Sequence, residues 1–180
     1  GGQDGSATTA TEEWSFPPPT AAILTEGSVF LSGGTTLKGF GKGAGVPAAT
    51  WASGGNLNTG RYGTYGAGTQ TAALCSGGDL GPSTTNNEAY NGNTWTELTN
   101  MNTARYYLGG AGTSTASVAF GGSLLPGDSD VSEEFDGTNW AEGDDLNTAR
   151  DQLAGTGTQT AGLAMGGSPA QTTVEEYNGS

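Results

Sequence analysis

The sequence predicts an all-β protein built from small sheets of four short strands, repeated along the chain. Three observations lead to this prediction. A unit of about 45 residues recurs after residue 50, its apolar stretches are short and interrupted by glycine, and Asn-Gly or Asp-Gly pairs mark hairpin turns. The apolar residues show no sustained period of ~3.6 residues, so helices are not expected.

Each copy of the repeat begins at a tryptophan. Trp51, Trp95 and Trp140 are 44 and 45 residues apart, which divides this part of the chain into copies at 51–94, 95–139 and 140–180, the third lacking its last strand. Every copy also carries an arginine in a turn, a glycine pair, and an aromatic residue before the hairpin turn. These are Arg61, Arg105 and Arg150, the pairs beginning at Gly77, Gly121 and Gly166, and Tyr90, Phe135 and Tyr177.

Four strands are expected in each complete copy. In the second copy, the first strand follows the arginine and covers Tyr106–Leu108, and the next, Ala116–Phe120, ends at the glycine pair. The third, Val131–Phe135, carries an acidic pair before an aromatic residue. Asp136-Gly137 then provides a turn that requires positive φ, and it leads into a fourth strand around Trp140.

The N-terminal part of the chain departs from this periodicity. Residues 1–14 resemble part of a copy, because Thr11–Trp14 match the acidic–aromatic segment of the later copies. Residues 15–50 are an insertion rich in proline and glycine, and three prolines from Pro17 favour an extended polyproline entry. Within the insertion, Gly27–Leu31 and Thr36–Phe40 flank a Gly-Gly turn, which predicts a β-hairpin.

The composition is unusual for a globular protein. Glycine accounts for 34 of the 180 residues, and 18 acidic residues face five basic ones, for a net charge of −13. Such a composition is also typical of disordered chains. The regular placement of glycine in pairs and turns, copy after copy, argues for an ordered fold.

The same composition excludes several functional classes. An acidic chain without a basic stripe is a poor match for nucleic acid or for anionic membranes. One cysteine and no histidine allow neither an internal disulfide nor a Cys/His zinc site, and they remove the commonest general base. No apolar run reaches the ~18 residues of a membrane span, and no secretory signal is expected in the first residues.

The order of the repeated features resembles the kelch-type repeat. It runs from a diglycine through an aromatic residue and a tryptophan to a small-residue turn ending in arginine, here Gly77-Gly78, Tyr90, Trp95 and Met101–Arg105. The resemblance implies a β-propeller of four-stranded blades. Because closed propellers have typically ~4–8 blades, this chain would hold an incomplete ring, completed by a longer chain or by other copies.

Shorter phrases resemble a narrower group of proteins. Thr-Glu-Glu-Trp, Asn-Leu-Asn-Thr and Leu-Thr-Glu-Gly are similar to kelch-like repeats in structural proteins of marine bacteriophages, especially cyanophages, where the repeats belong to fibres or tail-associated appendages. The resemblance implies a non-enzymatic virion protein, found on the particle or outside the cell, with other copies or other virion proteins as partners.

The charged residues have structural and functional interpretations. The repeat arginines could bind a carboxylate such as sialic acid, but their recurrence favours bonds to backbone carbonyls or to an adjacent blade's acidic residue. Asp136 faintly resembles the sialidase Asp-box, and a turn is the simpler interpretation. The pairs Glu12-Glu13, Glu133-Glu134 and Glu175-Glu176 could supply an acid and a base, but strand neighbours point to opposite faces, so a pair is not one site. One member of each pair could instead meet an arginine.

The remaining candidates lie in loops and around the arginine turns. Asp128, Asp130, Asp144 and Asp145 supply oxygen ligands that suit Ca²⁺, although their spacing is not that of a known site. Cys75 fits a small buried position, and without histidine neither a cysteine nucleophile nor the copper site of galactose oxidase, another kelch-type propeller, can be assembled. Tyrosines near the arginine turns either fill the packing or stack on sugar rings. They are Tyr62, Tyr65, Tyr106 and Tyr107.

Three functions follow from these features. The first is a structural module of a phage appendage, for which no catalytic, cofactor-binding or metal-binding residue is assigned. The second is a glycan-binding adhesin or lectin-like propeller that reads host glycans through loops that differ between copies, namely 79–83, 123–130 and 168–172. The third, a glycan hydrolase, has carboxylates available but lacks the marks of sialidases and galactose oxidase.

Overall fold

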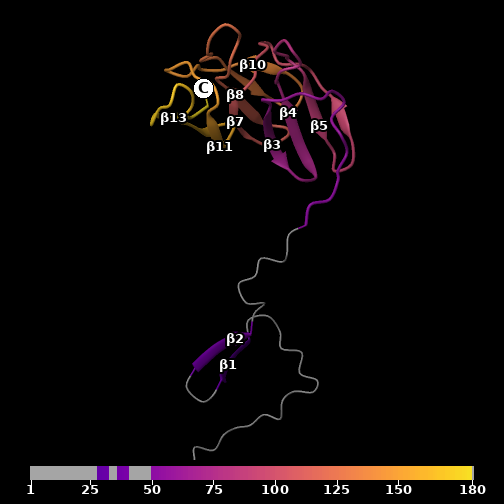
Figure 1. The fold of residues 1–180 in the computed structure, drawn as a ribbon, viewed down its shortest axis with the longest axis vertical. Coiled ribbons are helices and arrows are strands. Elements are labelled where there is room, and N and C mark those ends of the chain that lie inside the picture. Colours follow the sequence, from indigo (N-terminus) through magenta and orange to yellow (C-terminus); the bar gives the residue numbers. More distant parts are fainter. Residues whose placement is uncertain (1–27, 33–35, 41–49, 180) are drawn as a thin grey trace, which may run out of the picture. The chain divides into compact units, whose positions relative to one another are not determined.

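The computed structural model describes residues 28–32, 36–40 and 50–179. The chain divides into two compact units, Gly1–Ala52 and Ser53–Ser180. The described residues contain thirteen β-strands and no helix, which confirms the predicted all-β class (Figure 1). Accordingly, the structure describes no helix that is long and apolar enough to cross a membrane.

In the first unit, the described residues form the hairpin that the sequence predicts. Strand β1 (Ser28–Ser32) pairs antiparallel with β2 (Thr36–Phe40), with Leu31 opposite Leu37. The partial copy predicted at 1–14 and the prolines that begin at position 17 lie outside the described residues.

The second unit consists of three antiparallel sheets, each built around one copy of the repeat, and the fourth strands of the first two sheets begin at Trp95 and Trp140, where the next copy starts. Two of them have four strands and the third has three, so the copy that lacks its last strand also lacks the fourth strand of its sheet. The first sheet contains β3 (Tyr65–Thr69), β4 (Ala72–Ser76), β5 (Asn87–Tyr90) and β6 (Trp95–Glu97). The second contains β7 (Gly109–Gly112), β8 (Ser117–Phe120), β9 (Ser132–Phe135) and β10 (Trp140–Glu142), and the third contains β11 (Ala154–Thr158), β12 (Ala161–Met165) and β13 (Val174–Tyr177).

The three sheets meet through their first strands. Strand β7 lies between β3 and β11, which are its neighbours from the other two sheets (Figure 1). The Tyr65 hydroxyl of β3 donates a hydrogen bond of 2.8 Å to the carbonyl of Ala111 in β7, across the junction of the first two sheets. Two hydrophobic clusters fill the spaces between sheets, one around Leu74, Leu108 and Phe135, and the other around Val118, Phe120 and Leu153.

The first strand of the second copy does not lie where the sequence predicted. Tyr106–Leu108 precede the strand, which begins at Gly109. Tyr107 has a φ of 56°, in the left-handed region, and a residue in that conformation cannot continue an extended strand. The other three strands fall within a residue or two of their predicted places.

The glycine pairs allow neighbouring sheets to approach closely. Gly122 donates a backbone hydrogen bond of 2.9 Å to the carbonyl of Arg150, the arginine of the next copy, as Gly78 does to Arg105. A Cβ on Gly121 would lie 2.7 Å from that same Arg150 oxygen, and φ at Gly121 and Gly122 is 63° and 101°. Any side chain at Gly121 would therefore strain the backbone and push the sheets apart.

Candidate functional site

The three repeat arginines are buried within the sheets. Each forms an ion pair with a glutamate on the third strand of the sheet in its own copy: Arg61 with Glu88 at 2.8 Å, Arg105 with Glu133 at 3.0 Å, and Arg150 with Glu175 at 3.2 Å. Each also donates to a carbonyl of the second strand, that of Cys75, Ala119 or Ala164. The structural interpretation of the arginines is confirmed for the backbone bonds, but the acidic partner belongs to the same copy rather than an adjacent one.

Arg105 shows the arrangement most completely. Its guanidinium donates to the carbonyls of Gly121 and Val131 as well as to Glu133. Burial lowers the pKa of Arg105 from its ordinary value, and the charge of Glu133 opposes that shift. Glu133 also accepts the backbone N–H groups of Asn102 at 2.7 Å and Thr103 at 3.1 Å, so one carboxylate holds the segment that crosses between two sheets.

The two members of an acidic pair lie on opposite faces of their strand, as predicted. Glu133 is fully buried against Arg105, whereas its neighbour Glu134 is half-buried and accepts the hydroxyl of Tyr177 at 2.5 Å. Glu88 was not singled out from the sequence, because its copy reads Asn-Glu-Ala-Tyr. The usable signal is its place two residues before Tyr90, which matches the place of Glu133 before Phe135.

Asp136 forms a turn, and Asp145 bonds the backbone of a neighbouring strand. Asp136 accepts the N–H groups of Thr138 and Asn139, both at 2.7 Å, and these bonds lower its pKa. Asp145 accepts the N–H of Ser132 at 2.9 Å. Within residues 50–179 and the described hairpin strands, no three metal-ligating side chains of the His, Cys, Asp or Glu type come together, and Cys75 is buried.

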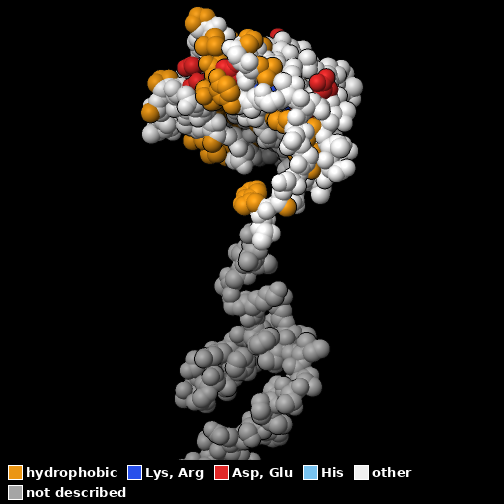
Figure 2. Space-filling view, turned by 45° about the vertical axis from the view of Figure 1, so that its right-hand side comes forward, with side chains coloured by type: hydrophobic (Ala, Val, Ile, Leu, Met, Phe, Trp, Pro, Cys, Tyr) orange, Lys and Arg blue, Asp and Glu red, His pale blue; other side chains and the backbone are white. Residues whose placement is uncertain are grey.

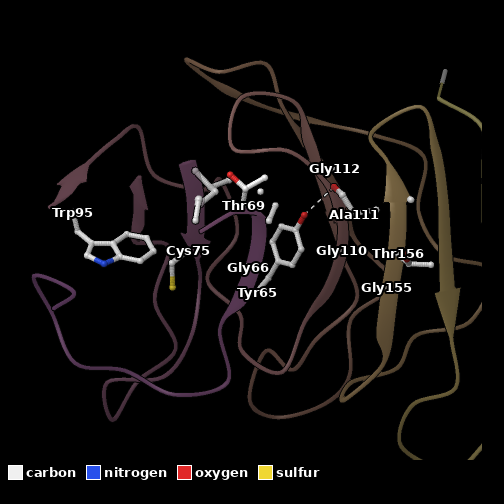
Figure 3. Close-up of a pocket in the computed structure, with 15 residues that line it drawn as sticks. Tyr65, Gly66, Thr69, Cys75, Trp95, Gly110, Ala111, Gly112, Gly155 and Thr156 are labelled. Atoms are coloured by element: carbon white, nitrogen blue, oxygen red, sulfur yellow. Dashed lines mark hydrogen bonds between the residues drawn. The ribbon is translucent and has the colours of Figure 1, made fainter. Parts of the chain in front are cut away.

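A shallow groove of about 500 Å³ runs along the first strands of the three sheets. Its lining is mostly backbone and small side chains, including Gly66, Gly110, Gly155 and Thr156 (Figure 3). The ring of Tyr65 stands in the middle of this view, with its hydroxyl committed to Ala111 (Figure 3). Burial raises the pKa of that hydroxyl well above its usual range, so Tyr65 stays protonated.

Three tyrosines near the arginine turns meet at one end of the first two sheets, and we call them the tyrosine cluster: Tyr62, Tyr106 and Tyr107. The ring of Tyr107 lies 6.1 Å from that of Tyr62 and 4.8 Å from that of Tyr106, measured between centroids. Tyr62 and Tyr107 are 55% and 37% exposed. The fourth candidate, Tyr65, is buried and belongs to the groove instead.

The loops that differ between copies lie against the tyrosine cluster. Backbone bridges join Tyr62 to Asp79 and Tyr106 to Ser123, the first residues of two of these loops. The next residues along the loops are exposed leucines, which sequence reasoning missed. Leu80 is 42% exposed, Leu124 38% and Leu125 58%. Of the seven large hydrophobic side chains exposed in the described part of the chain, five therefore belong to this end of the sheets.

Asp79 fixes the orientation of Tyr62. Its Oδ2 accepts the Tyr62 hydroxyl at 2.7 Å, and its Oδ1 accepts the N–H of Gly81 at 2.6 Å. The hydrogen bond to Asp79, together with its negative charge, raises the pKa of Tyr62 to about 12. The aromatic surface is thus held in place by a buried carboxylate, and the hydroxyl oxygen of Tyr62 keeps its acceptor capacity.

In comparisons with known proteins, no family model and no curated protein matches this chain. The function is therefore argued from the two features above, the buried arginine–glutamate pairs and the tyrosine cluster.

Proposed function

We propose that this chain is a non-enzymatic structural module, made of kelch-like propeller blades, from an appendage of a phage virion. The observation that carries the proposal is the repeated ion pair. Every arginine of the chain is buried and paired with one glutamate from each of the three sheets of the second unit, in the same arrangement. Three carboxylates that could otherwise serve in acid–base chemistry are thus committed to the framework.

The arrangement of the sheets supports the propeller part of the proposal. Blades of a propeller pack side by side with their first strands innermost, and β3, β7 and β11 are neighbours in that order. The contacts between successive sheets repeat as well, because the glycine pair of one copy bonds the arginine carbonyl of the next at both junctions.

An open sheet edge supports the assembly part. In the described residues, β5 and β9 each pair with a fourth strand, whereas the outer edge of β13 has none. Val174 on that strand is 55% exposed, while its counterparts Asn87 and Ser132 are each 1% exposed. An open edge is a template for another strand, and we propose that further blades, from a longer chain or another copy, continue from it.

Sedimentation of this 180-residue chain over a range of concentrations tests the assembly. We expect self-association through the edge of β13. The matched pair of variants is Glu176→Pro and Glu176→Gln. Glu176 occupies the place that Ala89 has in the first sheet. Asn87 and Asn91 both bond toward the fourth strand of that sheet, and every second residue of a strand faces the same neighbour, so the N–H of Ala89 faces the fourth strand too. The N–H of Glu176 therefore faces the open edge. Proline there removes only an edge donor, so it alone should reduce association. A monomer at every concentration contradicts assembly between copies and leaves a longer chain as the source of the further blades.

The assignment to a virion has its own test. An antibody against the repeat unit is expected to label fibres or tails on particles of the virus that encodes the chain. Particles that carry no label, together with detection of the protein only in host fractions, would remove the virion from the proposal and leave the scaffold.

A second function, glycan binding, is favoured by the tyrosine cluster. Exposed aromatic rings present flat apolar surfaces with polar rims, which suit the faces of sugar rings. The cluster lies beside the loops that differ between copies, where binding residues are commonly found. A glycan array probed with this chain tests the function, and a blank array counts against it.

A further inference from the structure

The position two residues after each repeat arginine has a left-handed conformation. Gly63, Tyr107 and Gln152 follow the arginine by two residues, and their φ angles are 64°, 56° and 53°. Glycine adopts this region freely, whereas tyrosine and glutamine are strained there. Two copies therefore retain a side chain where glycine would fit better.

The left-handed conformation itself belongs to the framework. The N–H of Tyr107 donates to the carbonyl of Gly63 at 2.7 Å, and the N–H of Gln152 donates to the carbonyl of Tyr107 at 2.8 Å. These bonds join the same position of successive copies. Because these hydrogen bonds involve only backbone groups, glycine could make them at all three positions. The bonds between copies therefore do not explain why position 107 carries a tyrosine side chain.

The ring of Tyr107 lies over Gly63 and beside Tyr62. A Cβ added to Gly63 would approach the Tyr107 Cδ1 to 2.9 Å, so glycine at position 63 leaves room for this ring. The ring then forms, with Tyr62, the most exposed part of the tyrosine cluster. Strain kept at an exposed aromatic residue is typical of a position selected for binding.

The charge of the surface limits what can bind. Residues 53–180 contain 14 acidic residues and three arginines, and the arginine side chains are fully buried in their ion pairs. The repeat unit therefore exposes no positive side chain. On the face seen in Figure 2, hydrophobic side chains gather beside acidic ones, and hardly any Lys or Arg surface is visible. A sialylated or phosphorylated glycan would be repelled and would find no cationic partner.

We propose that Tyr107, flanked by Tyr62 with its ring plane inclined by 57°, forms a stacking platform for an uncharged sugar ring, and that this role retains tyrosine at a position where glycine would fit better. The inference rests on the glycan-binding function proposed above and specifies its ligand class and its central residue. The Tyr62 hydroxyl, whose hydrogen is committed to Asp79, offers its oxygen to a sugar hydroxyl.

An array of neutral hexose and N-acetylhexosamine oligosaccharides, each printed beside its sialylated form, tests the ligand class. We expect binding to neutral members and at least about tenfold weaker binding to their sialylated forms. Equal or stronger binding of the sialylated forms overturns the inference.

Three variants test the role of Tyr107 on the neutral glycans that bind. Tyr107→Gly relieves the strain but removes the ring, and it should weaken binding about tenfold, the value of one aromatic stacking contact. Tyr107→Phe restores the ring and should recover most of that loss. Gln152→Gly relieves the same strain in the next copy, keeps the backbone bond to the Tyr107 carbonyl and removes no aromatic ring, so its affinity should stay within about threefold of wild type.

The outcomes separate the inference from the function on which it rests. If no glycan is bound, the glycan-binding function itself fails. If neutral glycans are bound but a cooperatively folded Tyr107→Gly variant binds them as well as wild type, the function stands and the platform is wrong. Cooperative thermal unfolding of each variant confirms that a loss of binding is not a loss of structure.

Discussion

Replacing Glu133 with glutamine removes the charge from the most buried ion pair of the protein. Both side chains of the Arg105–Glu133 pair are 0% exposed, and Glu133 holds two backbone N–H groups besides the arginine. Glutamine keeps one oxygen acceptor but turns an amide group toward these donors. The arginine would be left as a buried, unpaired charge.

The expected cost follows from that geometry. Breaking a buried pair by removing one partner destabilises proteins by about 3–5 kcal/mol, a large part of the ~5–15 kcal/mol that stabilises a typical domain. We therefore expect Glu133→Gln to lower the free energy of unfolding by about 3–5 kcal/mol. Urea unfolding followed by tryptophan fluorescence measures it, with the denaturant slope checked for constancy.

A neighbouring residue provides the matched control. Glu134 differs from Glu133 by one position, lies on the opposite face of β9, and has the Tyr177 hydroxyl as its hydrogen-bond donor. Glu134→Gln should cost less than about 1 kcal/mol, because glutamine still offers an acceptor at a half-buried site. The double variant Arg105→Met with Glu133→Leu removes the unpaired charge but leaves the Asn102 and Thr103 N–H groups without their acceptor, so it should recover only part of the lost stability. Equal losses for Glu133→Gln and Glu134→Gln, or a loss below about 1 kcal/mol for the former, would refute the framework role.

Three further measurements test other parts of the structure. Trp140 is 6% exposed and its ring lies 5.1 Å from that of Phe135, so Trp140→Ala should cost about 3–5 kcal/mol. Trp95→Ala should cost less because Trp95 is only half-buried, and similar losses for the two variants would contradict this difference in burial. Gly121→Ala should destabilise by more than about 2 kcal/mol through the clash with the Arg150 carbonyl, while Gly60→Ala, with open space around it, should be nearly neutral in the same denaturation assay. In a spectrophotometric titration, Tyr62 should ionise near pH 12 instead of 10. The folded state should keep the stabilisation from the Tyr62–Asp79 bond below pH 10 and lose it as the pH rises through 12. A Tyr62→Phe variant should lack the ionisation near pH 12, and a titration curve unchanged by this substitution would argue against the bond.

Much of the fold was predictable from local sequence. Hairpin turns such as Asp136-Gly137, short glycine-bounded strands and the spacing of the tryptophans are local signals, and the structure places the strands near the predicted residues. The strand predicted at Tyr106–Leu108 was wrong because the backbone there is fixed by a residue far away in the sequence. Tyr107 bonds Gly63, which lies 44 residues away, and nothing adjacent to Tyr107 reveals its left-handed backbone.

Some residues of the candidate site were predictable from the sequence and others were not. Sequence reasoning found the arginines and three tyrosines that later form a cluster, because their residue types and spacing are visible. It did not find Asp79, Leu80 or Leu125, since loops that differ between copies carry no repeated signal. The sequence also could not show which of two adjacent glutamates pairs with the arginine, because the alternation of a strand defines two faces but not which of them is buried.

By itself, the sequence determined the repeat, the all-β class and the absence of histidine chemistry, since each follows from counts, spacing or turn-forming residues. The tertiary structure alone decided how the charges are used. It buries every arginine with a glutamate and leaves the repeat unit with an acidic surface, and it brings Tyr62 and Tyr107 together from different copies. The physical reason is that burial and side-chain proximity depend on how sheets pack, and packing joins residues far apart in the chain.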